Sequence, residues 1–312
     1  MNRKHFLSLA GVSALGMAIP APSFSNYSSF KNKISLAQWS MNGSFFSKKE
    51  NIMDFALLAA SMGFSGVEYV NQFFFDTLKN GTTSSKNVNK LARELNMRAN
   101  DNEVSNVLIM LDEEGSLSHE SNAEITKAIE QHKKWVELAA ELGCESVRVN
   151  LSGTRDEKIW IDQSVVGLTG LCEFAKPMGI NVIVENHGGL SSNAGLLAQV
   201  MKQTNLDNCG TLPDFGNFCL AWGSKDGCKA RYDMYKGVAE LMPYAKSVSA
   251  KAYDFDKNGN ETKIDYAKMM QIVKNNNYKG YIGVEYEGSR LSEKEGILAT
   301  KNLIQKFILE FS

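Results

Sequence analysis

The stretch INVIVENHGGLSSNAGLLAQVMKQTNLDNCGTLPDFGNF, residues 180–218, decides the fold. An apolar, β-branched run ends in Glu185, a helix-like segment follows over about 193–203, and a second apolar run ends beside Asp214. Two buried strands in succession are thus predicted to finish in a carboxylate. A buried carboxylate is costly unless it binds something. In a barrel of parallel strands, the carboxyl ends of the strands are where active sites lie.

Strand-like and helix-like segments alternate through the rest of the chain. The predicted strands are 34–39, 67–70, 97–100, 146–149, 180–184, 210–212, 247–250 and 281–284. The predicted helices are 51–62, 87–95, 125–142, 161–178, 193–203, 229–242, 266–275 and 293–309, the third having the clearest apolar periodicity. Segment 101–118 is predicted to be a long loop. Eight such units, with no GxGxxG or GxxxxGK[ST] turn, favour one eightfold β/α barrel over an open doubly wound sheet.

The first residues have the composition of an export signal. Arg3 and Lys4 precede an apolar run over 6–19, and small residues and prolines follow. This pattern predicts a signal peptide over residues 1–25 and a periplasmic mature chain, residues 26–312, that forms a single barrel domain. The basic pair resembles a twin-arginine motif with Lys in the second place. A first buried helix is the alternative, and the run is too short for a membrane span.

Composition and cysteine usage limit the function further. The 312 residues are 43% hydrophobic and 22% charged, with a formal net charge of −1, so no general basic field exists for nucleic acid or anionic membranes. The five cysteines are odd in number and show no CxxC spacing. This argues against a disulfide framework and favours small buried side chains.

Three acidic side chains close predicted strands: Glu185, Asp214 and Glu285. Ser249 and Lys251 end another strand and point the same way by alternation. Three carboxylates at one barrel mouth repel one another, and a divalent cation is the usual solution. Oxygen ligands suit Mg²⁺ or Mn²⁺ better than Zn²⁺. Structural ion pairs at the barrel rim are the alternative.

Lys251 and four further side chains are candidates for binding substrate. His187 lies two residues after the first strand-end acid and is predicted to face the pocket. Arg148 and Asn150 lie at the carboxyl end of the fourth strand and could hold hydroxyl groups or form rim ion pairs. Glu68 closes the second strand, where a salt bridge to a neighbouring strand is the other reading.

These motifs resemble a known family over essentially the whole mature chain. The segments that carry the likeness are VENHGG, TLPDFGNF, SAKAYDFD, YIGVEYEG, CESVRVN and GVEY. They are similar to the xylose isomerase-like TIM barrels, a group that contains sugar phosphate isomerases and epimerases. The resemblance implies a (β/α)8 fold and one metal bound by Glu185, Asp214, a histidine and Glu285. It also implies that Glu185 and Glu285 act as acid and base beside a sugar carbonyl.

One position departs from the family pattern. The expected histidine is Ser249, so either water or substrate fills an open ligand position, or Lys251 replaces the charge of the cation. The expected function is a sugar isomerase or epimerase acting on a free sugar or keto-sugar. A lyase or hydratase acting on a keto-glycoside and a non-catalytic sugar-binding barrel are the alternatives. The related zinc-dependent nucleases need more histidines than the four present.

Overall fold

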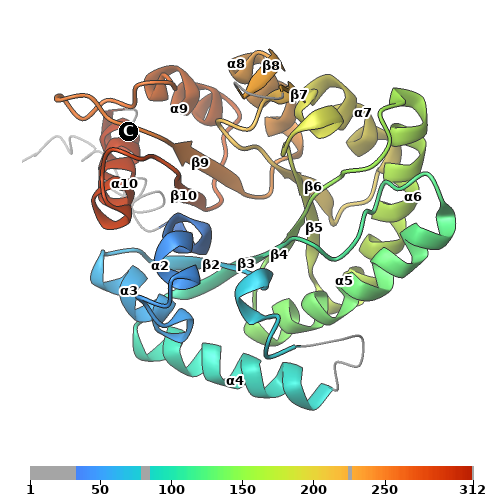
Figure 1. Cartoon of the computed structure of the whole chain (residues 1–312), viewed down its shortest axis with the longest axis horizontal. Coiled ribbons are helices and arrows are strands. Elements are labelled where there is room, and N and C mark those ends of the chain that lie inside the picture. The colour runs from blue at the N-terminus through green and yellow to red at the C-terminus, as the bar shows by residue number, and fades with distance from the viewer. Residues whose placement is uncertain (1–32, 79–84, 224–226, 311–312) are drawn as a thin grey trace, which may run out of the picture.

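The computed structural model describes residues 33–78, 85–223 and 227–310. The predicted leader, residues 1–25, lies outside them. Within this part, the chain forms a β/α barrel with strands inside and helices outside (Figure 1). None of the helices described is both long enough and apolar enough to cross a membrane.

Eight strands form the barrel wall, and all of their pairings are parallel. They are β1 (Ile34–Ala37), β2 (Gly66–Val70), β3 (Ser105–Leu111), β4 (Ser146–Val149), β5 (Asn181–Glu185), β6 (Cys209–Leu212), β9 (Val248–Ala252) and β10 (Ile282–Tyr286). Their order is β6-β5-β4-β3-β2-β1-β10-β9. Isolated parallel bridges, Thr211 to Ala245 and Asp214 to Ser249, join the two outermost strands and close the wall. The single (β/α)8 barrel predicted from the sequence is confirmed.

Helices cover the outside of this wall. They are α3 (Phe55–Ser61), α4 (Ser85–Asp101), α5 (Asn122–Leu142), α6 (Glu157–Ala175), α7 (Ala194–Thr204), α8 (Met234–Leu241), α9 (Tyr266–Asn275) and α10 (Glu293–Glu310), with a short α2 (Asn42–Phe46) after β1. Helix α5 ends where predicted, at Gly143, whose positive φ of 70° suits a left-handed cap. The strands of the barrel wall are buried almost throughout, as parallel sheets covered by helices require, and their buried polar side chains include Glu68, Arg148 and Lys251.

The predicted third strand was wrong. Residues 97–100 belong to α4, and the strand is β3, inside the segment predicted to be a loop. Met97 is exposed on the outer face of the helix. The apolar run 107–111 is continuous, as expected for a strand buried on both faces, and its lack of alternation concealed it.

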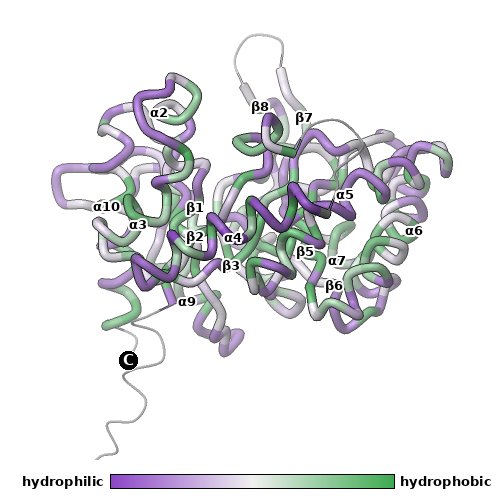
Figure 2. Tube along the Cα trace, turned by 90° about the horizontal axis from the view of Figure 1, so that it is seen from below, coloured by the Kyte–Doolittle hydropathy of each residue, from purple (hydrophilic) through white to green (hydrophobic). Residues whose placement is uncertain are grey.

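The predicted helix 229–242 was also partly wrong. Helix α8 begins at Met234, after Asp233 accepts a hydrogen bond from the backbone N–H of Lys236. The preceding residues form β8 (Cys228–Arg231), which pairs antiparallel with β7 (Cys219–Trp222). This hairpin projects from the barrel on the same side as α2 (Figure 2).

A disulfide joins Cys219 to Cys228 across this hairpin. The expectation that cysteine usage argues against disulfides was therefore wrong for one pair. The remaining cysteines match the expectation of apolar packing: Cys144 and Cys172 are free and buried, and Cys209 is free and half-buried.

Candidate active site

The three strand-end carboxylates converge at the barrel mouth. Glu185 is the last residue of β5, Asp214 follows β6 by two residues, and Glu285 lies in β10. One oxygen of each lies within 4.8 Å of the others, and all three side chains are buried. They meet because the strands are parallel and in register, so that their carboxyl ends share one edge.

Ser249, at the position where the family resemblance implies histidine, bridges two of these acids. Its Oγ lies 2.7 Å from Oδ2 of Asp214 and 2.8 Å from Oε2 of Glu285. A hydroxyl carries only one proton, so it cannot donate to both carboxylates. One of the two acids must therefore carry a proton in this arrangement.

The surroundings decide which acid that is. Burial raises the pKa of Asp214 to about 7, outweighing the effect of Lys251. Burial also acts on Glu285, but Lys251 and the Ser249 hydroxyl hold the pKa of that carboxyl below its ordinary value. A proton shared in this cluster is therefore held more readily by Asp214 than by Glu285.

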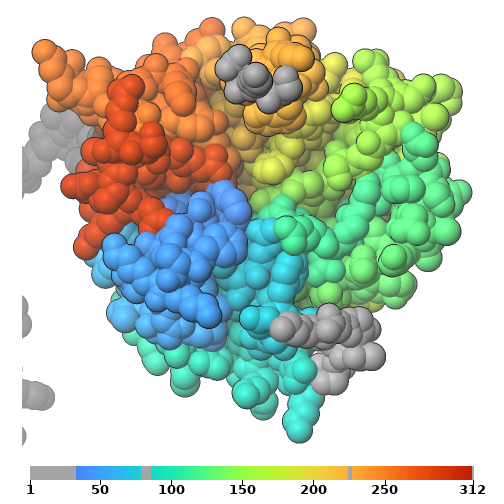
Figure 3. Space-filling view, in the orientation of Figure 1, coloured from blue at the N-terminus to red at the C-terminus, as the bar shows by residue number. Residues whose placement is uncertain are grey.

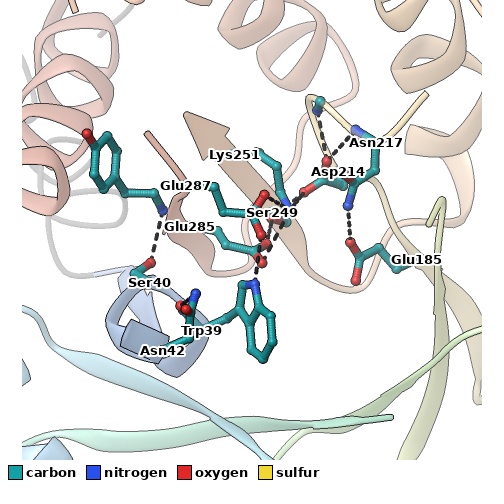
Figure 4. Close-up of polar contacts among 12 residues, drawn as sticks. Trp39, Ser40, Asn42, Glu185, Asp214, Asn217, Ser249, Lys251, Glu285 and Glu287 are labelled. Atoms are coloured by element: carbon teal, nitrogen blue, oxygen red, sulfur yellow. Dashed lines mark hydrogen bonds and ion pairs between the residues drawn. The ribbon is translucent and has the colours of Figure 1, made fainter. Parts of the chain in front are cut away.

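Lys251 places a cation among the carboxylates. Its Nζ lies 3.3 Å from Glu285 Oε1, 3.4 Å from Glu287 Oε2 and 3.9 Å from Asp214 Oδ2 (Figure 4). The side chain is buried, yet these anions hold the pKa of Lys251 well above its usual value in spite of that burial. Trp39 fixes the outer acid by donating its indole N–H to Glu287 Oε1 at 2.7 Å.

Arg148, in β4, places a second cation at the barrel mouth. Its Nη1 lies 2.9 Å from Asp112 Oδ1, and its Nε lies 2.9 Å from Glu185 Oε2. Asn150 donates to the same Asp112 oxygen at 2.6 Å. Arg148 and Asn150 therefore lie together at the mouth, and Asp112 holds both in place.

Asparagines position the β5 and β6 acids. Asn217 donates its side-chain N–H to Glu185 Oε1 at 2.8 Å, and its backbone N–H to Asp214 Oδ1 at 2.7 Å. Asn186 accepts from the backbone N–H of Asp214 at 2.8 Å. Burial raises the pKa of Glu185 to about 7, more than the adjacent Arg148 lowers it.

His187 borders a cavity of about 550 Å³ above the acids, together with Glu287 and Asn217. Figure 3 views the molecule onto this face, where the surface is hollowed between the N-terminal segment in blue and the hairpin region in orange. Desolvation, Arg148 and Lys251 lower the pKa of His187, so its ring is neutral at pH 7 and can donate or accept a hydrogen bond.

Glu68 has a different environment from the other candidates. It is fully buried and does not border that cavity, and it accepts a hydrogen bond from the hydroxyl of Ser35 on the neighbouring strand. Burial raises the pKa of Glu68 to about 8. It forms no ion pair with any residue in the described ranges, so this carboxyl is a neutral acid inside the barrel at pH 7.

Sequence reasoning missed Asp112, Asn217 and Trp39. The signal for Asp112 was present, because it directly follows the apolar run 107–111, as Glu185 follows its own strand. Assigning that run to a loop hid it. The side chains of Asn217 and Trp39 reach Glu185 and Glu287 in distant segments, and their residue types carried no such signal.

The residues present fit a divalent cation. Five carboxylates, those of Asp112, Glu185, Asp214, Glu285 and Glu287, face only two cationic side chains, Arg148 and Lys251. Burial raises the pKa of two of these carboxyls, Glu185 and Asp214, and a bound cation would offset the cost of their buried negative charge. The ligand oxygens would be those of Glu185, Asp214 and Glu285, a donor set typical of Mg²⁺ or Mn²⁺.

Fold and site together define a barrel with an acidic centre, and comparison with known proteins gives its family. The family model described as xylose isomerase-like TIM barrel matches residues 56–306. The chain therefore belongs to the xylose isomerase-like TIM barrel family.

Individual relatives are more distant. A 54-residue stretch, 17% of this chain, is 35% identical to the C-glycoside deglycosidase alpha subunit of Arthrobacter globiformis, and it spans only 15% of that protein. The apo form of 3-keto-D-glucoside 4-epimerase from E. coli superposes with a TM-score of 0.63 at 13% identity, covering 82% of this chain and 95% of the other. A xylose isomerase-like TIM barrel protein from Mycobacterium smegmatis, in complex with magnesium, gives 0.60 at 16% identity, covering 90% and 98%. At these identities the two structures establish the fold alone.

Proposed function

We propose that this protein is a sugar isomerase or epimerase that moves a proton on the carbon next to the carbonyl of a sugar or keto-sugar. One observation carries the proposal. Glu185 and Glu285, two buried carboxylates on separate strands, converge on one point where Arg148 and Lys251 also lie. Proton transfer beside a carbonyl needs a base, an acid and positive charge for the enolate oxygen, and this site holds all three.

The environments of the two glutamates suggest their roles. Glu285, with a lowered pKa, is ionised at pH 7 and is suited to remove the proton. Glu185, with a pKa of about 7, can hold a proton and return it. Acid and base separated in this way are typical of enzymes that work at neutral pH. Because the two glutamates lie on different strands, they can address opposite faces of one carbon, which epimerisation requires.

The other side chains would bind and orient the substrate. Arg148 and Lys251 would stabilise the developing negative charge on oxygen, and His187 and Asn150 would bind hydroxyl groups. Glu185, Asp214 and Glu285 would hold a divalent ion, Mn²⁺ or Mg²⁺, which when bound supplies further positive charge for that oxygen. Ser249 would then keep its place beside Asp214 and Glu285 as a hydrogen-bonding neighbour.

Hydrogen exchange tests the proposal directly. A keto-sugar incubated with the protein in D₂O should gain deuterium next to its carbonyl. Glu185→Gln or Glu285→Gln should slow this exchange by at least about 100-fold, the lower end of what positioned proton transfer contributes. Glu114→Gln is the matched control, since this buried glutamate binds Trp135 and Lys134 outside the acidic centre. Metal content is measured for each variant. Exchange that survives in both glutamate variants would refute the assignment, and sugar affinity without exchange would indicate a non-catalytic binder.

A lyase or hydratase acting on a keto-glycoside is the second candidate. The partial similarity to a C-glycoside deglycosidase subunit favours it. The same enolate can expel a group from the next carbon instead of being reprotonated. Product analysis by NMR separates the two reactions, because elimination releases the substituent and epimerisation retains it.

A further inference from the structure

The connection between β6 and α8 carries a hairpin that the barrel core does not use. Strands β7 and β8 are held by the Cys219–Cys228 disulfide, with Cα atoms 5.6 Å apart. Apart from Cys219, the residues of both strands are half-buried or exposed. Long connections at the carboxyl ends of barrel strands usually serve binding or catalysis. The hairpin therefore needs a functional explanation.

Trp222 of this hairpin lines the cavity at the barrel mouth, together with Arg231, His187 and Glu287. It is 69% exposed, more than any other large hydrophobic side chain in the described ranges. Its indole Nε1 lies 3.4 Å from the position that a Cβ on Gly188 would occupy. The exposed ring thus lies beside the loop that directly follows Glu185, inside the site and not on a remote surface.

An exposed indole that lines a cavity is suited to stacking against a ring of the ligand. The C–H groups on the face of a sugar ring and at the edge of an aryl ring carry partial positive charge and pack on the electron-rich face of an indole. Arg231 and Lys263 supply hydrogen-bond donors on the same wall. A volume of about 550 Å³ lies within the range of pockets that enclose drug-sized ligands, so there is room for a second group beside the reacting sugar ring.

We propose that the β7–β8 hairpin is a subsite for the group attached to the sugar, with Trp222 as its stacking surface. The substrate is then a keto-glycoside and not a free keto-sugar. The inference rests on the proposed function for the identity of the reacting ring. The subsite itself rests on the position of Trp222, and the disulfide joins the two strands of the hairpin, which reduces the entropy that the hairpin loses on binding.

Binding of two unreactive probes tests the subsite. D-glucose and phenyl β-D-glucoside lack the keto group and differ only in the attached ring. By calorimetry, the wild-type protein should bind the glucoside about tenfold more tightly than glucose, as expected for one stacked ring. Trp222→Ala should remove this preference and leave glucose affinity unchanged within about twofold, and Trp222→Phe should keep most of it. Phe46→Ala is the matched control, because Phe46 is 59% exposed on α2 and does not line the cavity.

The possible results distinguish a failure of the subsite proposal from a failure of the proposed reaction. Equal affinity for the two probes in the wild-type protein, an equal loss for both in Trp222→Ala, or the same loss in Phe46→Ala would overturn the subsite. Deuterium exchange is measured in parallel on the corresponding 3-keto compounds. A preference that depends on Trp222, without exchange of either keto compound, would support the subsite and refute the proposed isomerase.

Discussion

The ammonium nitrogen of Lys251 lies 3.3 Å from Oε1 of Glu285, its neighbour in the β9–β10 pairing. This contact gives a buried carboxyl a lowered pKa inside a barrel that raises the pKa of Glu185 and Asp214. Lys251 therefore keeps the pKa of Glu285, the base of the proposed reaction, below the pKa values of Glu185 and Asp214.

Lys251→Met should abolish most of the exchange activity. Without the ammonium, burial dominates and the pKa of Glu285 rises, so the base is protonated at neutral pH. Exchange is expected to fall at least about 100-fold at pH 7, with the acid limb of the pH–rate profile moved to higher pH. Lys263→Met, which removes a lysine that lines the cavity and forms no ion pair with the carboxylates described at the acidic centre, should have little effect on this profile. An unchanged acid limb in Lys251→Met would show that the lysine does not control the base.

The purified protein should contain one divalent ion per chain at the acidic centre. Asp214→Ala is expected to lose it, because one of the three carboxylate ligands is removed. Elemental analysis after extensive dialysis provides the measurement. Asp254→Asn serves as control, since Asp254 binds the backbone N–H groups of Ser289 and Arg290 and lies outside this centre. Native protein free of metal, or unchanged metal in Asp214→Ala, would contradict the assignment.

Asp112 and Arg148 should be strongly coupled in stability. Asp112→Asn removes the charged partner of a buried guanidinium, and Arg148→Met removes the guanidinium itself. A double-mutant cycle in urea is expected to give a coupling energy of about 1.5–3 kcal/mol, as for hydrogen bonds to charged groups. The half-exposed pair of Arg98 and Asp54 should give less than about 1 kcal/mol. Equal coupling in the two pairs would show that burial adds nothing here.

Glu68→Gln should stabilise the protein at neutral pH. The pKa of Glu68 rises from 4.5 to about 8 on folding, so the native state retains a proton that the unfolded state releases. Wild-type stability therefore falls as pH rises from 4.5 to about 8, and this part of the slope disappears in Glu68→Gln. The gain at pH 7 is about 3 kcal/mol, from 1.36 kcal/mol per pKa unit. The free energy of unfolding between pH 5 and 8 is measured, with the exposed Glu124→Gln as control; parallel curves for Glu68→Gln and wild type would contradict it.

The disulfide should protect the hairpin and not the whole barrel. In the Cys219→Ala/Cys228→Ala variant, trypsin is expected to cleave rapidly after the exposed Lys229 and Arg231, while the midpoint of global unfolding changes little. The strands of this hairpin bury few side chains, so its opening is local. Cys144→Ala, at a buried free cysteine, should leave the cleavage pattern unchanged. A large fall in the global midpoint would show that the hairpin belongs to the core.

The N-terminal leader predicts that the protein is exported. Disulfides persist in oxidising compartments, and the Cys219–Cys228 bond therefore adds a reason to test the signal peptide predicted over residues 1–25. The native protein should begin after about residue 21 to 26 and be found in the periplasm. Mass spectrometry of the native N-terminus after cell fractionation makes the test, and an intact Met1 would refute it.

The sequence by itself determined the barrel and its acidic centre. Apolar strand runs alternating with amphipathic helices specify β/α units, and Glu185, Asp214 and Glu285 follow from their places at strand ends, because parallel strands bring those ends to one edge. Only the tertiary structure decided the rest. Local periodicity carries no information on contacts between distant segments, so it could not show Asp112 holding Arg148, Ser249 bridging two acids, or the hairpin that brings Trp222 to Gly188.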